Sequence, residues 1–328
     1  MPDRSVRDGV AILVTGAAGF VGRALTARLV RRGPRFGRIM AATHDTVLPW
    51  SHPNLSVAHG KNLSPTEDWS DALAGISTVI HCAARVHALR EAGDALALHR
   101  QINTAGTLNL ARQSVAAGVR RFVFLSSIKV NGESTPTGRP FTADDAVTPS
   151  DPYGIAKMEA EQGLRELARG HGLEVVVVRP PLVYGPGAKA NFQALMRALA
   201  RGWPLPLGAV TRNRRSLVAL DNLVDLLAVC AEHPAAAQRT FLVSDGEDLS
   251  TAALLRRLGV ALGRPARLFP VPIAWLDAAA ALLGRREALR RLCGSLQVDM
   301  RSTRETLGWT PSISVEEGLR RAAAAFRA

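Results

Sequence analysis

A glycine-rich turn near the N-terminus constrains the fold of this chain more than any other feature. The segment TGAAGFVG (15–22) follows a predicted apolar strand and leads into a predicted helix. In this spacing Gly16 allows a tight turn, Gly19 lets a pyrophosphate approach the backbone, and Gly22 lets the helix pack closely on the sheet. The helix N-terminus adds N–H donors and a positive dipole for phosphate. An ordinary turn that happens to contain glycines is the alternative, but the flanking strand and helix favour a dinucleotide site.

Apolar strands alternate with helices along much of the chain. Strands are predicted at residues 9–15, 38–43, 54–59, 78–82, 121–126, 174–179 and 239–244, and helices at 20–32, 95–117, 152–170, 191–201 and 221–233. This alternation predicts an α/β fold with a doubly wound, Rossmann-like parallel sheet.

A change of pattern predicts a second, smaller domain. Proline and glycine crowd residues 179–187, as in a loop that leaves the sheet. We predict a dinucleotide-binding domain over residues 1–179 and 214–247, and a mostly helical C-terminal substrate lid over 180–213 and 248–328. The ligand site is expected in the cleft between the two parts.

Composition is that of an ordinary globular enzyme. Of the 328 residues 47% are hydrophobic and 21% charged, so the chain can bury a large core. The longest apolar run, 273–283, contains Asp277 and is too short to span a bilayer, and no apolar segment precedes the first strand. Three widely spaced cysteines without a CxxC pair argue against disulfides or zinc. We therefore expect a cytoplasmic protein without a membrane span or a bound metal.

The net charge of +13 raises the question of an acidic partner. The arginines are spread along helices, as in Arg31-Arg32 and Arg290-Arg291, without interleaved aromatic residues. This pattern is typical of a solvated surface, and no nucleic acid partner is expected. A diphosphate substrate would account for a few of these arginines.

The segment YGIAK (153–157) carries the strongest chemical signal. Tyr153 and Lys157 are four residues apart, so their side chains share one face of the helix that Pro152 opens. Bringing a tyrosine pKa from about 10 to about 7 takes roughly 4 kcal/mol. A nearby ammonium and a positive nicotinamide ring act in that direction. The pair predicts proton transfer beside a dinucleotide.

Three further polar residues are candidates for the same site. Ser127 follows the fifth strand, where its hydroxyl would hold a substrate oxygen or only bond nearby backbone. Ser126 should point to the opposite face. Asn103 would hold a backbone group or a water near Lys157, and His81 is expected to be a packed, hydrogen-bonded histidine.

The choice between NAD and NADP stays open at the end of the second strand. An acid there would bind the ribose hydroxyls and select NAD. The position is about Thr43, followed by His44 and Asp45. Asp45 would bind the ribose hydroxyls. Alternatively, Asp45 would be out of register with the ribose, which would leave room for a 2′-phosphate beside His44.

Together these segments resemble the extended short-chain dehydrogenase/reductase family, and within it the nucleotide-sugar epimerases and dehydratases typified by UDP-glucose 4-epimerase. The resemblance covers nearly the whole chain. It rests on TGAAGFVG (15–22), HCAA (81–84), NTAGTLNL (103–110), FLSSIKVNG (124–132), YGIAK (153–157), RPPLVYGPG (179–187), RRSLVALDNLVD (214–225) and LGWTP (307–311).

The resemblance implies roles for particular residues. The implied catalytic residues are Ser127, Tyr153 and Lys157; the cofactor-binding residues are Gly16, Gly19, Phe20, Gly22, Ala83 and Asn103; and the residues for the uridine diphosphate are Asn191 and Arg214. A homodimer through helices 95–117 and 152–170 is also implied. Two positions depart from the family: Asn131 replaces a frequent tyrosine, which bears on the sugar pocket, and no clear acid stands ready for the ribose.

The segment SSIKVNG resembles a subgroup linked with bacterial surface-polysaccharide sugars. The resulting hypothesis is an NAD(P)-dependent epimerase acting at C4 of a UDP-hexose or UDP-N-acetylhexosamine. An NAD(P)H-dependent reductase of a UDP-4-keto-6-deoxy sugar is the alternative, since it would use the same site. A non-catalytic dinucleotide-sensing regulator and a reductase of a lipophilic compound also stay open, although the basic residues 212–215 favour a phosphate.

Overall fold

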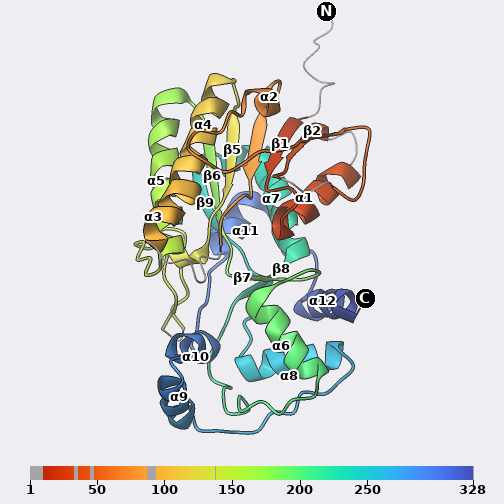
Figure 1. Ribbon diagram of the computed structural model, residues 1–328, viewed down its shortest axis with the longest axis vertical. Coiled ribbons are helices and arrows are strands. Elements are labelled where there is room, and N and C mark those ends of the chain that lie inside the picture. Colours follow the sequence, from red (N-terminus) through yellow and green to blue (C-terminus); the bar gives the residue numbers. More distant parts are fainter. Residues whose placement is uncertain (1–9, 33–35, 45–47, 87–93, 137, 328) are drawn as a thin grey trace, which may run out of the picture.

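The structure is a computed structural model that describes residues 10–32, 36–44, 48–86, 94–136 and 138–327. A sheet with helices on both faces forms its upper part in Figure 1, and a group of helices forms its lower part. The two-part α/β architecture agrees with the sequence-based prediction.

The central sheet has seven strands, all paired in parallel, in the order β3-β2-β1-β4-β5-β6-β9. The chain builds it outward from β1 in both directions, so the order reverses between β1 and β4. Ligands of such sheets bind outside the carboxyl ends of the strands near this reversal. The strands are β1 (Val10–Thr15), β2 (Phe36–Ala42), β3 (Leu55–Ala58), β4 (Thr78–His81), β5 (Arg121–Leu125), β6 (Glu174–Arg179) and β9 (Arg239–Leu242).

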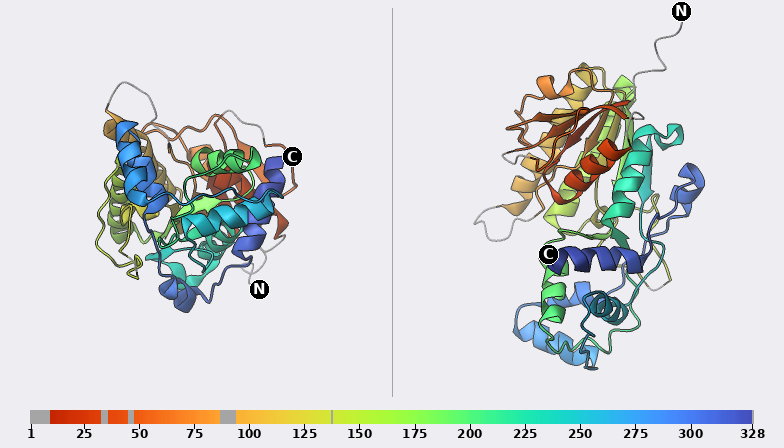
Figure 2. Two further views of the ribbon diagram at one scale, coloured as in Figure 1. Left: turned by 90° about the horizontal axis from the view of Figure 1, so that it is seen from below. Right: turned by 90° about the vertical axis from the view of Figure 1, so that its right-hand side faces the viewer.

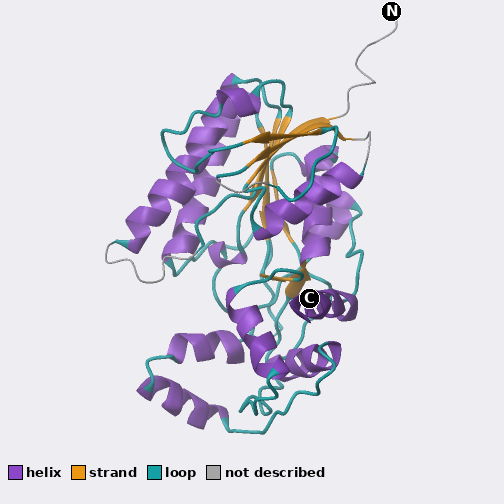
Figure 3. Cartoon of the chain, turned by 45° about the vertical axis from the view of Figure 1, so that its right-hand side comes forward, coloured by secondary structure: helices purple, strands orange, loops and turns teal. Residues whose placement is uncertain are grey.

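Helices cover both faces of this sheet, as Figures 1 and 3 show. One face packs against α1 (Phe20–Arg31) and α7 (Leu220–Glu232), and the other against α4 (Thr107–Ala116) and α5 (Pro152–His171). Alternation along β1 produces this division, because Ile12 and Val14 belong to one core cluster and Leu13 to the other. Both faces are therefore buried, which explains the nearly continuous apolar strands.

The predicted helix over residues 95–117 is helical throughout but changes its winding. It consists of α3 (Ala95–His99), a π-helical stretch (Arg100–Gly106) and α4. The wider π-turn contains Asn103, one of the predicted site residues. Such stretches are frequent at functional sites, and sequence periodicity did not reveal this one.

Three short helical segments complete the sheet-containing part. They are α2 (Ser70–Leu73) and the single 3₁₀ turns η4 (Ile128–Val130) and η5 (Pro234–Ala236). The turn η4 matters for the site, because it starts immediately after Ser127.

The lower part is built from helices around a core cluster of its own. Its main elements are α6 (Ala190–Ala200), α8 (Thr251–Ala261), α9 (Ile273–Leu282), α10 (Arg286–Cys293) and α12 (Val315–Arg327). Phe192, Leu255 and Leu319 are among the buried residues that join α6, α8 and α12. Figure 2 shows α12 between the sheet and the remaining lower helices. We call α6, α8, α9 and α10 the helical lid.

A short ribbon lies where the two parts meet. Strand β7 (Leu182–Tyr184) pairs in parallel with β8 (Leu217–Ala219). The predicted loop over residues 179–187 thus contains a strand. Three residues among prolines and glycines give too weak a local signal for a strand, which is formed here by pairing with a distant segment.

The segment that carries α11 (Arg301–Leu307) packs on the sheet-containing part. Met300, Leu307 and Trp309 belong to the same core cluster as α1 and α7. The Trp309 indole Nε1 donates to Asp225 Oδ2 of α7 over 2.8 Å. The boundaries of the two domains stay a prediction, and this packing ties the C-terminal stretch to both cores. Within the described ranges, no helix has the length and apolar character needed to span a bilayer.

Candidate active site

The glycine turn between β1 and α1 has the close packing that its spacing predicts. Gly16 has a φ of 65°, and a Cβ there would lie 2.8 Å from the backbone nitrogen of Ala83. A Cβ on Gly22 would lie 2.1 Å from the carbonyl oxygen of Gly16. Gly19, by contrast, would meet only that carbonyl, at 3.1 Å. The turn therefore brings β1, α1 and the end of β4 together and leaves the backbone at Gly19 accessible.

The N-terminus of α1 fits an anionic group. Gly19 is its N-cap, no side chain caps the helix, and no acidic residue stands in its first turn. The first N–H groups of a helix lack partners within the helix, and the dipole favours negative charge there. Together with the glycine turn, these donors fit the pyrophosphate of a dinucleotide.

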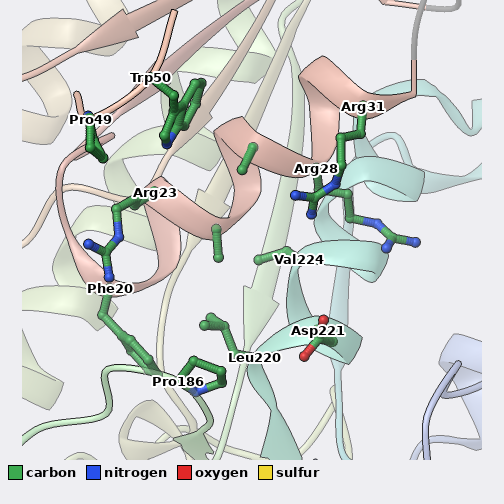
Figure 4. A pocket seen from close by; sticks show the side chains of 12 residues that line it. Phe20, Arg23, Arg28, Arg31, Pro49, Trp50, Pro186, Leu220, Asp221 and Val224 are labelled. Atoms are coloured by element: carbon green, nitrogen blue, oxygen red, sulfur yellow. The ribbon is translucent and has the colours of Figure 1, made fainter. Parts of the chain in front are cut away.

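The side chain of Phe20 points away from this turn. It lines a pocket of about 340 Å³ along the outer side of α1, with Arg23, Trp50, Pro186 and Leu220 among the other lining residues. Figure 4 shows the ring close to Pro186 and Leu220. None of the predicted catalytic residues lines this pocket. Only the backbone N–H of Phe20 is therefore placed for the predicted cofactor contact.

Asn103 fastens the loop after β4 to the π-helical stretch. Its Oδ1 accepts from the Arg85 backbone N–H over 2.8 Å, and its Nδ2 donates to the Arg85 carbonyl over 2.9 Å. The same Nδ2 lies 3.0 Å from His99 Nδ1. Of the two predicted partners, a backbone group or a water near Lys157, the structure shows the backbone of Arg85, in the segment that follows Ala83.

His81 is the packed, hydrogen-bonded histidine that we expected. It is fully buried, with Nδ1 2.6 Å from Thr15 Oγ1 and Nε2 2.9 Å from Thr107 Oγ1. Burial, helped by the charge of Lys157, holds its pKa well below the ordinary value. A neutral ring with both nitrogens engaged is a structural group and not a proton carrier. His87, its neighbour in the sequence, lies outside the described residues.

Tyr153 and Lys157 share one face of α5, directly beside the end of β5. Asp151 caps the helix by accepting from the Gly154 N–H over 2.6 Å, and Pro152 opens it. Lys157 Nζ donates to the Leu125 carbonyl over 2.9 Å and lies 5.9 Å from the centre of the Tyr153 ring. The predicted pairing of these two side chains is thus present, with the ammonium tied to the carboxyl end of β5.

Burial shifts the pKa of each side chain in the direction that favours its neutral form. It lowers the pKa of Lys157 from 10.5 to about 8. It raises the pKa of Tyr153 above the ordinary value, and the nearby Asp151 carboxylate acts in the same direction. The groups of the chain alone therefore do not lower the tyrosine pKa in the way that the sequence argument requires. A positive charge supplied by a bound ligand acts in the required direction.

Ser126 and Ser127 point to opposite sides, as strand alternation predicts. Ser126 is buried, and its Oγ donates to Glu161 Oε1 over 2.6 Å. Ser127 is partly exposed, and its Oγ accepts from the Lys129 N–H over 3.3 Å at the start of η4. That bond leaves the hydroxyl hydrogen of Ser127 available as a donor. Ser127 is accordingly the serine that is free to meet a ligand.

A buried ion pair behind Ser126 was not foreseen from the sequence. Glu161 and Arg179 are almost fully buried, and Arg179 Nε donates to Glu161 Oε1 over 2.9 Å. A signal did exist, since Glu161 continues the spacing of Tyr153 and Lys157 along the same helix face. The pair fixes α5, which carries the tyrosine and lysine, to the end of β6.

Asn131 belongs to this interior network. It is fully buried, its Oδ1 accepts from Arg179 Nη1 over 2.9 Å, and its Nδ2 donates to the Thr142 carbonyl over 3.0 Å. Its departure from the family pattern therefore changes the interior behind the site. The Asn131 side chain therefore would not contact a sugar directly, and its expected effect on the sugar pocket would be indirect.

The two residues predicted for the diphosphate lie on separate elements. Asn191 is exposed in the first turn of α6. Arg214 is exposed in the loop before β8, and its Nη1 donates to the Thr211 and Asn213 carbonyls over 3.2 and 3.1 Å. The next residue, Arg215, turns inward, and burial lowers its pKa. Arg212 is exposed as well, so the basic stretch offers two exposed arginines and one half-buried arginine.

The end of β2 does not settle the choice of cofactor by itself. Thr43 is buried, with its Oγ1 3.4 Å from His59 Nδ1. Asp45, the predicted acid, lies outside the described residues.

Comparison with known proteins supplies what the geometry leaves open. The family described as NAD dependent epimerase/dehydratase matches residues 12–244. A UDP-glucose 4-epimerase of Vibrio cholerae is 45% identical over 316 residues, which cover 96% of this chain and 95% of that protein.

Solved structures agree with this assignment of the fold. A UDP-glucose 4-epimerase of Thermotoga maritima with UDP-glucose superposes with a TM-score of 0.76 at 24% identity, covering 97% of this chain and 99% of that chain. MoeE5 in complex with UDP-glucose and NAD superposes with a TM-score of 0.75 at 25% identity, covering 97% and 98%.

Proposed function

Since the chain belongs to the NAD-dependent epimerase/dehydratase family and is a UDP-glucose 4-epimerase-like enzyme within it, we propose that it epimerises C4 of a UDP-hexose or a UDP-N-acetylhexosamine. The observation that carries the proposal is the grouping of Tyr153, Lys157 and Ser127 around the carboxyl end of β5. The likeness to the Vibrio cholerae epimerase over nearly the full length supports it. A role in surface-polysaccharide synthesis is part of the same proposal.

Each catalytic side chain has a distinct task in this mechanism. Tyr153 takes the proton of the C4 hydroxyl and later returns it to the C4 oxygen. Lys157, which is mostly protonated below pH 8, lies 5.9 Å from the centre of the Tyr153 ring and favours the tyrosinate together with the positive charge of a bound ligand. Ser127 donates its free hydroxyl hydrogen to the same C4 oxygen and so holds it in register.

The cofactor is held by backbone in this proposal. The N–H of Phe20, at the start of α1, would bind the pyrophosphate, while the Gly19 N–H closes the turn on the Gly16 carbonyl over 2.9 Å. Asn103 keeps the segment after Ala83 in place beside it. When bound, NAD would supply the acceptor and donor of the C4 hydride, so that no cofactor would be consumed in a full cycle. Asn191, on α6 of the lid, and Arg214, in the loop before β8, would bind the uridine diphosphate, because a guanidinium suits a diphosphate.

A coupled experiment tests the reaction. The purified chain, supplied with NAD, is incubated with UDP-glucose or UDP-N-acetylglucosamine, and the sugars are separated by anion-exchange chromatography. Conversion to the C4 epimer without net change in nicotinamide absorbance is the expected result. Stoichiometric oxidation of NADH or NADPH by a UDP-4-keto-6-deoxy-hexosamine, without epimerisation, would establish the reductase instead. Cofactor binding without turnover of any of these sugars would point to a regulator.

Replacing Tyr153 with Phe tests the proton-transfer step. The variant keeps the ring, which packs edge-on to His99 at 5.9 Å, and loses only the hydroxyl. Turnover should fall by about 10²- to 10⁴-fold, while NAD binding followed by fluorescence quenching should stay unchanged. Turnover near that of the wild type would remove Tyr153 from the mechanism.

We also propose that the active form is a cytoplasmic homodimer that pairs the helices at 95–117 and 152–170. These helices lie side by side on one outer face of the molecule (Figure 1). Light scattering should then give about twice the chain mass of 35.0 kDa. A monomer at micromolar concentration would contradict the proposal.

A further inference from the structure

Helix α9 has an apolar face that points away from the protein. Trp275, Ala278, Ala279 and Leu282 follow one another at helical spacing and are all exposed. Trp275 is 73% exposed and Leu282 is 90% exposed, and Leu283 directly after the helix is 73% exposed. The outer face of a surface helix in a globular protein is normally polar, so this face is the reverse of the usual pattern.

The opposite face of α9 attaches it to the helical lid. Ala280 is buried, and Leu276 packs against the lid core. Asp277, the only charged residue of the helix, lies on the partly buried side and pairs with Arg286 of α10 at 3.4 Å. The helix is therefore fixed in an orientation that keeps the tryptophan and leucine in solvent.

A strongly basic helix continues the chain directly after this apolar face. Leu283 is followed by Gly284 and then by α10, whose inner side packs through Leu292 and Cys293. Four arginines, all of them exposed, stand at the turn and along α10: Arg285, Arg286, Arg290 and Arg291. Asp277 pairs with Arg286, and both Glu287 and Glu133 pair with Arg291, so these three carboxylates offset part of the charge of the four arginines.

The size of the apolar face argues against a second copy of the chain as its partner. A helix of ten residues is about 15 Å long, and one face of it offers about 150–250 Å². A stable protein interface buries about 800 Å² on each partner. A lipid surface needs less, because a few apolar side chains that enter the acyl boundary act together with arginines at the headgroups.

We propose that the α9–α10 hairpin, residues 273–293, is a docking surface for a bilayer of anionic phospholipid. Trp275 and Leu282 enter the boundary between headgroups and acyl chains, and the arginines of α10 contact the lipid phosphates. The hairpin forms the lower edge of the molecule, away from the sheet (Figures 1 and 3), so docking leaves the sheet-containing part in water. The net charge of +13 adds long-range attraction to the same surface.

Vesicle co-sedimentation with the full chain tests the proposal. Vesicles of phosphatidylglycerol and phosphatidylethanolamine are compared with vesicles of phosphatidylcholine at low and physiological salt. The wild type should pellet with the anionic vesicles and bind phosphatidylcholine about tenfold less well or worse. Trp275→Ser/Leu282→Ser should lower partitioning into anionic vesicles about tenfold, and Arg285→Gln/Arg290→Gln should remove most of its salt dependence.

A matched variant separates this surface from general stickiness. Trp203→Ser/Val260→Ser also removes an exposed tryptophan and an exposed aliphatic residue, 53% and 74% exposed, but outside the hairpin. It should bind vesicles like the wild type. Absence of pelleting by the wild type, or equal loss in both double variants, would overturn the proposal. So would a shift from dimer to monomer in the Trp275/Leu282 variant without vesicle binding, because the face would then belong to a second copy.

Discussion

At the scale of single residues, Lys157 carries its charge inside the protein. It is 1% exposed, and burial lowers its pKa from 10.5 to about 8. The shift corresponds to a net cost of about 3 kcal/mol for keeping this ammonium charged at neutral pH, even with its hydrogen bond to the Leu125 carbonyl. The residue therefore costs stability where it serves the chemistry.

Lys157→Met is expected to abolish turnover without lowering stability at pH 7. In the wild type the folded state binds fewer protons than the unfolded state between pH 8 and pH 10.5. Wild-type stability should thus rise over this interval relative to the variant, and any advantage of the variant should fade there. Urea unfolding at pH 7 and pH 10 measures both values. A variant that is clearly less stable than the wild type at pH 7 would show that the buried charge does not lower the free energy of unfolding.

At the scale of elements, α5 depends on the ion pair that fixes it to β6. Glu161→Gln leaves the guanidinium of Arg179 buried without a charge partner and should destabilise the protein by about 3–5 kcal/mol. Glu159 supplies a matched control on the same helix, because it pairs with Arg100, whose side chain is 52% exposed. Glu159→Gln should cost about 0–1 kcal/mol. Similar losses in the two variants, measured by urea unfolding, would contradict this account.

The turn before α1 allows a second comparison between glycines. Gly22→Ala would place a Cβ 2.1 Å from the Gly16 carbonyl oxygen, so α1 must move away from the sheet. We expect a loss of about 3 kcal/mol together with weakened NAD binding. Gly170→Ala, in α5 with no atom within 4 Å of the added Cβ, should instead gain about 0.5–1 kcal/mol. Thermal unfolding and NAD titration distinguish the outcomes, and tolerance of Gly22→Ala would disprove the close approach.

At the scale of the whole molecule, a buried polar group joins the two parts. Asp245, just after β9, accepts from the Tyr184 hydroxyl, the Ala219 N–H and Asn222 Nδ2 over 2.7, 2.8 and 2.7 Å. Asn222 Oδ1 in turn accepts from the Ile313 N–H over 3.0 Å, ahead of α12. Burial raises the pKa of Asp245 despite these donors. The ribbon, α7 and the C-terminal segment are thereby held at one point.

The two tyrosines of the chain should therefore respond to substitution in opposite ways. Tyr184→Phe removes one donor from the buried Asp245 carboxylate and should lower the free energy of unfolding by about 1–3 kcal/mol, with kcat retained. Tyr153→Phe should lower kcat and leave stability within about 0.5 kcal/mol. Paired unfolding and turnover measurements check this. Loss of kcat in the Tyr184 variant at full stability would place that hydroxyl in the chemistry.

The features that sequence alone determined are local in the chain. The parallel α/β alternation, the glycine turn and the start of the tyrosine helix depend on side-chain periodicity, glycine geometry and a capping residue, which act over a few residues. The shared face of Tyr153 and Lys157 follows from helix geometry in the same way. The π-turn at Asn103 was not predicted, because the periodicity of apolar residues in the sequence does not distinguish it from an ordinary α-helical turn.

Only the tertiary structure decided which side chains face a ligand and which face the interior. In the folded protein Ser126 donates a hydrogen bond to Glu161, and Arg215 turns inward beside the exposed Arg214. It also buried Asn131 against Arg179, 48 residues away in the chain. The longest apolar run of the sequence forms α9, yet nothing in the described part of the molecule covers its Trp275, which is 73% exposed. Burial is a property of contacts between distant segments, and local sequence therefore determines the elements but not the environment of each side chain.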